Sequence, residues 1–240
     1  MSKLSVVIIT KNSEKYIEDA IKSARFADEV LILDSGSSDK TCEIARNLGA
    51  RVEISEWLGF GKQKQKAVEL AKNEWVFVLD SDERITKKLQ EEIIKELKSP
   101  MFKAYYVPRL NNFFGKNIKR MGLYPDYSIR LFNKNFAKFN EKEVHESVEC
   151  SCKKGYLKNP MIHLAYENIE EFISKQNRYS SLGAKPNKIK AVFAPFWTFF
   201  KLYFLKLGFL EGWHGFVISK LYSEYTFWKY IKEKNENFSN

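Results

Sequence analysis

Residues 75–83 read Trp75-Val76-Phe77-Val78-Leu79-Asp80-Ser81-Asp82-Glu83, an apolar run that ends in an acidic cluster. The apolar run predicts a buried strand. Side chains two residues apart on an extended chain share a face, so Asp80 and Asp82 point to one spot at the end of this strand. Two such carboxylates suit a divalent cation that keeps water and takes substrate phosphates as its remaining ligands. A helix N-cap is the alternative interpretation, because Asp82 or Thr86 can begin a helix over 87–97.

Strand-like and helix-like segments alternate through the first hundred residues. The runs Leu4–Thr10 and Val30–Leu33 are typical of strands buried on both faces, and a short strand is expected over 51–54. Helices are expected over 16–24, 41–48 and 62–71. This alternation predicts a parallel sheet covered by helices, in which ligands bind beyond the carboxyl ends of the strands.

Three of these strand ends carry residues that can bind a ligand: Thr10 with Asn12, Asp34, and the acidic pair described above. Their coincidence at one edge of the sheet favours a ligand site over a simple helix cap. Asp34 also begins a segment rich in serine and glycine, which is typical of an Asx turn. The turn does not exclude function, because it stands where the sheet would hold a ligand.

Three segments resemble the signature sequences of family 2 glycosyltransferases. They are Val6-Val7-Ile8-Ile9-Thr10-Lys11-Asn12-Ser13-Glu14, Leu33-Asp34-Ser35-Gly36-Ser37-Ser38-Asp39-Lys40-Thr41 and Leu79-Asp80-Ser81-Asp82-Glu83. The second half is similar to the lipopolysaccharide core β-1,4-glucosyltransferases. That likeness is carried by Tyr124-Pro125-Asp126, Arg130-Leu131-Phe132, Val144-His145-Glu146, Ile162-His163 and Lys175-Gln176-Asn177-Arg178-Tyr179-Ser180. The resemblance implies an inverting enzyme with the GT-A fold, a Rossmann-like α/β nucleotide-sugar-binding fold with a mixed, mainly parallel sheet and a C-terminal helical appendage.

On the donor side, the resemblance implies a role for each strand end. Asp34 would accept a hydrogen bond from the nucleobase, beside Thr10 and Asn12. Asp80 would hold the ribose or approach a metal ion through water. Asp82 would bind Mg²⁺ or Mn²⁺ bridging the two phosphates, and such an ion stabilises the charge that develops on the departing nucleoside diphosphate.

Three further residues are assigned to the same pocket. Lys64 is the predicted diphosphate contact, although the lysines of its segment also fit an exposed charged helix face. Gln65 stands where many relatives carry Asn and is placed in the donor pocket. His163 follows two apolar residues, Met161 and Ile162, and the resemblance implies that it is a third metal or diphosphate contact. A structural role is the alternative, because isolated histidines are more often structural.

An inverting transfer needs a general base near the acceptor hydroxyl. Glu146 is the best match to the family's acidic residue, and Asp126 is the second candidate. Glu146 also fits an exposed strand carboxylate. His145 is expected to orient Glu146 or the acceptor, and Arg130 to pair with a carboxylate or a phosphate.

We expect a catalytic domain over 1–165, with a donor-binding half over 1–100 and an acceptor half over 101–165, followed by a basic, aromatic helical region over 166–240. Residues 1–100 hold 17 Lys and Arg against 18 Asp and Glu, whereas residues 101–240 hold 23 against 12. A basic surface favours anionic partners such as membrane lipid, nucleic acid or phosphorylated glycan.

The segment Ala191–Leu210 is nearly long enough to span a bilayer, but Lys201 and Lys206 interrupt it. On a helix, six apolar side chains gather on one side: Phe193, Phe196, Trp197, Phe200, Phe204 and Leu207. This pattern predicts an interfacial helix whose lysines meet lipid headgroups. A helix packed on the catalytic domain and a true span remain as alternatives.

Cys42, Cys150 and Cys152 are the three cysteines. Cys150 and Cys152 are too close for an ordinary metal site, so all three are expected to be free thiols in a reducing compartment. Core sequence begins directly after Met1-Ser2-Lys3, and no signal peptide is expected. We therefore expect a cytoplasmic protein, peripheral on the cytoplasmic face of the inner membrane.

The resemblance implies a metal-dependent transferase that moves a sugar, with glucose as first choice, from a nucleoside diphosphate sugar such as a UDP-sugar. The acceptor would be a lipid-linked glycan of a lipopolysaccharide or lipooligosaccharide core, or alternatively a capsule, glycoprotein or polyprenyl-linked glycan. A nucleotidyltransferase is disfavoured because no glycine-rich, basic loop follows the first strand. A nucleic-acid-binding module would explain the positive charge but not the convergence of Asp34, Asp80 and Asp82, so no nucleic acid is expected as partner.

Overall fold

The computed structural model describes residues 2–140 and 146–233. By its internal contacts the chain divides into two compact units, Met1–Arg109 with Asp126–His163, and Leu110–Pro125 with Leu164–Asn240. The first unit ends close to the expected boundary at 165. Residues 110–125, however, group with the C-terminal residues, because their apolar side chains pack into the core of the second unit.

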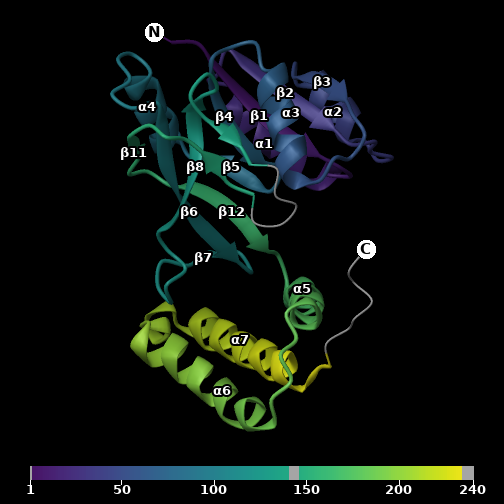
Figure 1. Cartoon of the computed structure of the whole chain (residues 1–240), viewed down its shortest axis with the longest axis vertical. Coiled ribbons are helices and arrows are strands. Elements are labelled where there is room, and N and C mark those ends of the chain that lie inside the picture. The colour runs from purple at the N-terminus through teal and green to yellow at the C-terminus, as the bar shows by residue number, and fades with distance from the viewer. Residues whose placement is uncertain (1, 141–145, 234–240) are drawn as a thin grey trace. The chain divides into compact units, whose positions relative to one another are not determined.

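Four strands of the first unit pair in parallel: β1 (Leu4–Thr10), β2 (Glu29–Asp34), β3 (Arg51–Ile54) and β4 (Trp75–Asp80). Their order is β3-β2-β1-β4 (Figure 1), as the alternating sequence pattern predicts. The sheet continues through β8 (Asp126–Asn133), β6 (Ala104–Phe113), β12 (Met161–Tyr166) and β5 (Glu83–Ile85), with antiparallel pairing of β4 to β8, of β8 to β6 and of β12 to β5. The short strands are β7 (Lys116–Asn117), β9 (Lys138–Phe139), β10 (Val148–Glu149) and β11 (Lys154–Tyr156).

Helices cover both faces of the parallel strands. Successive side chains of a strand point to opposite faces, so Val6 and Ile8 of β1 join one core and Val7 and Ile9 the other. The first core receives apolar side chains from α1 (Glu14–Ala24), α2 (Thr41–Asn47) and α4 (Lys87–Glu96), and the second from α3 (Phe60–Leu70). This three-layer arrangement places the carboxyl ends of β1, β2 and β4 along one edge.

Thr86 caps α4, because its hydroxyl accepts the backbone N–H of Leu89 at 3.3 Å. The capping alternative is therefore correct for Thr86 and not for Asp82. Asp82 lies in the turn between β4 and β5. Its carboxylate therefore does not cap α4.

The second unit contains α5 (Ile169–Leu182), α6 (Lys188–Phe200) and α7 (Trp213–Ile231), with a π-helical turn (Lys201–Leu205) and a 3-10 turn (Gly208–Glu211) after α6. The expected single helix over 191–210 is thus interrupted: α6 ends at Phe200, and Leu207, in a left-handed conformation with φ 58°, separates the π-helical turn from the 3-10 turn. Within residues 2–140 and 146–233, no helix combines the length and the apolarity that crossing a bilayer requires. The apolar core of this unit is formed by side chains of β6, β12, α5 and α7, among them Phe113, Ala165, Phe172 and Ile218.

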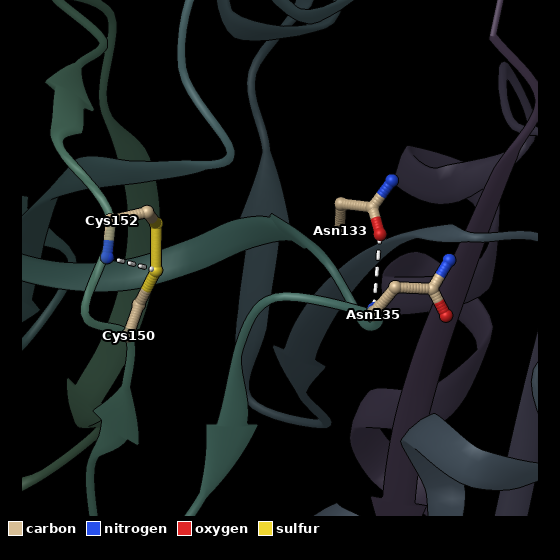
Figure 2. Close-up of a disulfide and its surroundings, with 4 residues drawn as sticks. All are labelled: Asn133, Asn135, Cys150 and Cys152. Atoms are coloured by element: carbon tan, nitrogen blue, oxygen red, sulfur yellow. Dashed lines mark hydrogen bonds between the residues drawn. A yellow bond between two sulfur atoms is a disulfide. The ribbon is translucent and has the colours of Figure 1, made fainter.

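Cys150 and Cys152 form a disulfide, as Figure 2 shows, whereas Cys42 is free. The expectation of three free thiols is therefore wrong. A bend at Ser151 brings the two Cα atoms to 5.3 Å, within the range that a disulfide spans. The close spacing that excludes an ordinary metal site does not prevent a disulfide between Cys150 and Cys152. The cysteines therefore give no support to the prediction of a reducing compartment.

Candidate active site

The turn after β2 fixes the carboxylate of Asp34, which is fully buried. Asp34 Oδ1 accepts the backbone N–H groups of Gly36 and Ser37 at 3.0 and 2.8 Å, and Oδ2 accepts the hydroxyls of Thr10 at 2.9 Å and Ser37 at 2.5 Å. Gly36 adopts φ 82°, a conformation that suits glycine. Burial alone would raise the pKa of Asp34, but these hydrogen bonds outweigh it and hold the pKa below its usual range. The predicted Asx turn is confirmed.

Asn12 ties the loop after β1 to this turn. Its backbone N–H donates to Ser37 Oγ at 2.8 Å, and its Oδ1 accepts the backbone N–H of Ser38 at 2.9 Å. Thr10, Asn12 and Asp34 therefore come together at the adjacent ends of β1 and β2, as the sequence predicts. Whether they hold a nucleobase stays a prediction.

Asp80, at the end of β4, lies at the centre of a chain of ion pairs. Its Oδ1 is 3.0 Å from Lys64 Nζ, and its Oδ2 is 3.0 Å from Arg130 Nη2. Lys64 Nζ also reaches Glu146 Oε1 at 3.0 Å, and Arg130 Nη2 reaches Glu83 Oε1 at 2.8 Å. Removing one partner of a buried pair typically costs about 3–5 kcal/mol, so this network holds its members firmly in place.

The network also sets the charge of its members. Burial alone would raise the pKa of Asp80, but the Lys64 ammonium and the Arg130 guanidinium hold it far below its usual range. Burial alone would lower the pKa of Lys64, but the carboxylates of Asp80 and Glu146 raise it. Burial, opposed by Arg130 and reinforced by Asp80, raises the pKa of Glu83. Asp80 is thus a firmly ionised carboxylate and Lys64 a firmly charged ammonium.

Asp82 and His163 form a second, less buried pair beside this network. The distance from Asp82 Oδ2 to His163 Nε2 is 3.5 Å. Among the described residues, 2–140 and 146–233, no group of three or more His, Cys, Asp and Glu side chains could hold a metal ion. Asp82 and His163 are therefore two close side chains of types that can ligate a metal ion, whereas Asp80 is engaged by its cationic neighbours.

A cavity of about 520 Å³ opens above these groups. It is lined by Ile9, Thr10, Lys11, Ser13, Trp57, Phe60, Lys64, Asp80, Ser81, Asp82, Glu146 and His163. Most of the candidate donor, metal and base residues thus face one space.

The sequence interpretation missed the two aromatic residues of this cavity. The rings of Trp57 and Phe60 meet edge to face with centroids 4.8 Å apart. A usable pattern was present, because Trp57 lies in the loop after β3, and Phe60, the first residue of α3, follows the glycine that ends this loop.

Gln65 lies apart from the cavity, contrary to its predicted placement in the donor pocket. Its Nε2 donates to Glu69 Oε1 at 2.8 Å, and its Oε1 accepts the backbone N–H of Phe139 at 2.9 Å. Gln65 thereby joins α3 to β9, and it does not line the cavity. His145 lies outside the described residues.

Asp126, the second candidate base, is engaged by Arg109. Arg109 Nε donates to Asp126 Oδ2 at 2.9 Å, and its Nη1 lies 3.8 Å from Glu83 Oε1. Ion pairs therefore continue from Glu146 through Asp80 and Glu83 to Asp126. The sequence interpretation gave Glu83 and Arg109 no role, because a buried charge inside a strand becomes recognisable only when its partner is known.

The chain is similar to several known proteins. The profile of Glycosyl transferase family 2 matches residues 5–164. An uncharacterized glycosyltransferase of Rickettsia bellii is 34% identical, over 96% of this chain and 85% of its own length. The lipopolysaccharide core biosynthesis glycosyltransferase LpsC of Rhizobium meliloti is 28% identical, over 93% of this chain and 89% of its own.

Among solved structures, residues 1–349 of S. aureus TarS in complex with UDP-GlcNAc superpose with a TM-score of 0.51 and 19% identity. The match covers 90% of this chain and 79% of that one. This likeness is one of fold. With the family match, it confirms the predicted α/β GT-A fold.

Proposed function

The chain belongs to glycosyl transferase family 2, and we propose that it is an inverting, metal-dependent enzyme that moves a sugar from a nucleoside diphosphate sugar to a lipopolysaccharide or lipooligosaccharide core acceptor. UDP is the proposed nucleotide and glucose the proposed sugar. The proposal rests chiefly on one observation, the cavity in which Thr10, Lys64, Asp82 and Glu146 face the same space. The likeness to LpsC supports the acceptor class.

On the donor side, we assign the diphosphate to the region between Lys64 and the Asp82–His163 pair. A carboxylate and an imidazole 3.5 Å apart fit a divalent ion that takes its other ligands from water and phosphate oxygens. When bound, such an ion stabilises charge on the departing nucleoside diphosphate. Asp80, which Arg130 also holds, positions the Lys64 ammonium at the cavity wall.

On the acceptor side, Glu146 is the proposed general base. The acceptor oxygen attacks the anomeric carbon opposite the diphosphate, and its proton passes to the Glu146 carboxylate. The bond from that carbon to the phosphate oxygen breaks, and its electron pair leaves with the nucleoside diphosphate. Glu146 is suited to this role because it lines the cavity and Lys64 Nζ holds one of its oxygens at 3.0 Å.

Thermal unfolding in the presence of UDP tests the donor assignment. UDP with Mn²⁺ should raise the unfolding temperature by several degrees, because a ligand at a hundred times its Kd stabilises the folded state by about 2.7 kcal/mol. UDP with EDTA should give a much smaller shift. A shift with ATP and none with UDP would favour the nucleotidyltransferase alternative, and no shift with any nucleotide would contradict the proposal.

We also propose that the second unit binds an anionic membrane surface, which would bring the enzyme to a lipid-linked acceptor on the cytoplasmic face. The six apolar side chains singled out in the sequence all lie exposed, each with 40–75% of its surface accessible: Phe193, Phe196, Trp197, Phe200, Phe204 and Leu207. Lys201 and Lys206 stand among them and are also exposed. This exposure favours an interfacial role over packing of that face in a core.

Sedimentation with vesicles that contain anionic lipid tests this surface. Each lysine near such a surface contributes about 1 kcal/mol, and apolar burial adds a part that salt does not screen. Binding should therefore weaken with salt without vanishing. A Phe196/Phe200/Phe204→Ser variant should lose the salt-resistant part, whereas an Ile169/Ile173/Leu182→Ser control on α5, also exposed, should keep it. Wild-type protein that stays in the supernatant at low salt would contradict the membrane proposal.

A further inference from the structure

A second cavity, of about 460 Å³, lies within the first unit, beside the donor cavity. Lys64, Asp80 and Glu146 line both cavities. The candidate base therefore borders both spaces. A group bound in the second cavity would reach Glu146 from a side other than the one that the donor occupies.

Tyrosines form one wall of the second cavity. Tyr106 and Tyr127 line it, and Tyr127 has 42% of its surface exposed. Tyr156 braces both rings, because it stacks on Tyr106 with centroids 4.7 Å apart and meets Tyr127 edge to face at 5.1 Å. A braced aromatic surface next to a few polar groups is typical of pockets that bind a small organic ring.

The charges of this cavity argue for an uncharged ligand. Arg130 is held by Asp80 and Glu83, and Arg109 donates to Asp126, so both lining guanidinium groups already have carboxylate partners. An anionic ligand would have to displace a carboxylate from one of them, which the buried network around Arg130 opposes.

The hydroxyls of Ser128 and Ser147 are polar groups in the lining of this cavity. Ser128 Oγ accepts Arg130 Nε at 3.2 Å, and Ser147 Oγ accepts Asn140 Nδ2 at 2.9 Å. Each hydroxyl also carries its own O–H, which can donate to a ligand oxygen. Such groups match the hydroxyls of a sugar.

We propose that this second cavity is the acceptor subsite, in which an uncharged sugar ring of the acceptor glycan lies against Tyr127 and Tyr106 and presents a hydroxyl to Glu146. This inference rests on the proposed glycosyltransferase function. It adds the chemical class of the bound group, a neutral hexose or heptose ring rather than a phosphate, and it names tyrosines that determine acceptor binding.

Saturation-transfer NMR with a deacylated lipopolysaccharide core oligosaccharide, without donor, tests the subsite. The wild type should saturate ring protons of the oligosaccharide. Tyr127→Ala should raise the Kd about tenfold, equivalent to about 1.4 kcal/mol, because the sugar ring loses its aromatic contact. Tyr127→Phe, which keeps the ring, should bind as the wild type does. Phe136→Ala, which removes an exposed aromatic residue outside both cavities, should also leave the Kd unchanged.

The same titration with a chemically dephosphorylated oligosaccharide should give an unchanged Kd. No binding by the wild type, equal binding by Tyr127→Ala, or a requirement for phosphate would each overturn the subsite. The thermal shift with UDP and Mn²⁺, measured on the same samples, reports donor binding separately. A normal shift with no oligosaccharide binding would therefore refute the acceptor subsite alone, whereas loss of the UDP shift would refute the proposed function.

Discussion

Asp82→Asn is expected to abolish sugar transfer while the protein stays folded. Asp82 lies in a turn, caps no helix and forms its close contact with His163 at 3.5 Å, so the amide should be accommodated without loss of structure. The amide lacks the charge that anchors a divalent ion at the diphosphate. Without that anchor, the charge on the departing nucleoside diphosphate loses its counter-ion.

Transfer of radiolabel from UDP-glucose to the core oligosaccharide measures this effect, with circular dichroism as the folding check. Asp19→Asn is a matched control, because Asp19 is exposed on α1 and lines neither cavity. The control should keep wild-type turnover, and wild-type enzyme in EDTA should behave as Asp82→Asn does. Wild-type turnover by a folded Asp82→Asn protein would refute the metal assignment.

Glu146→Gln is expected to lower turnover on the order of 10²-fold or more, the loss usual for a positioned general base. Glu146 lines both cavities, and Lys64 Nζ holds one of its oxygens at 3.0 Å. Donor binding should persist, so the UDP-induced thermal shift of this variant should match that of the wild type.

Asp126→Asn decides between the two candidate bases. The Asp126 carboxylate is engaged by Arg109 and lines neither cavity, so its loss should reduce turnover far less than the loss of Glu146. An inactive Asp126→Asn protein beside an active Glu146→Gln protein would reverse the assignment.

The sequence was sufficient to predict the parallel half of the sheet, because continuous apolar runs and helical spacing are local properties. It also placed Thr10, Asn12, Asp34 and Asp80 correctly at neighbouring strand ends. Parallel pairing explains this result, because it brings the carboxyl ends of β1, β2 and β4 to one edge of the sheet.

The partners of those residues were not predictable in the same way. Lys64 and Glu146 are 82 positions apart, and Arg130 and Glu83 are 47 apart, so their pairing depends on the tertiary fold. Gln65 was wrongly placed for a related reason. It follows Lys64 in α3, but Lys64 lines the cavity whereas the side chain of Gln65 contacts β9. The disulfide was not predicted because the Cys150-x-Cys152 spacing was tested only against metal sites. Whether the two sulfurs can bond depends on a local bend of the backbone.

The central claim is that the cavity at the ends of β1 and β4 performs metal-dependent sugar transfer. Incubating the wild type with radiolabelled UDP-glucose, Mn²⁺ and the core oligosaccharide tests it most directly. We expect label in the oligosaccharide, release of UDP in equal amount, and loss of both in EDTA. Absence of labelled oligosaccharide with every nucleotide sugar tried, or equal transfer in EDTA, would contradict it.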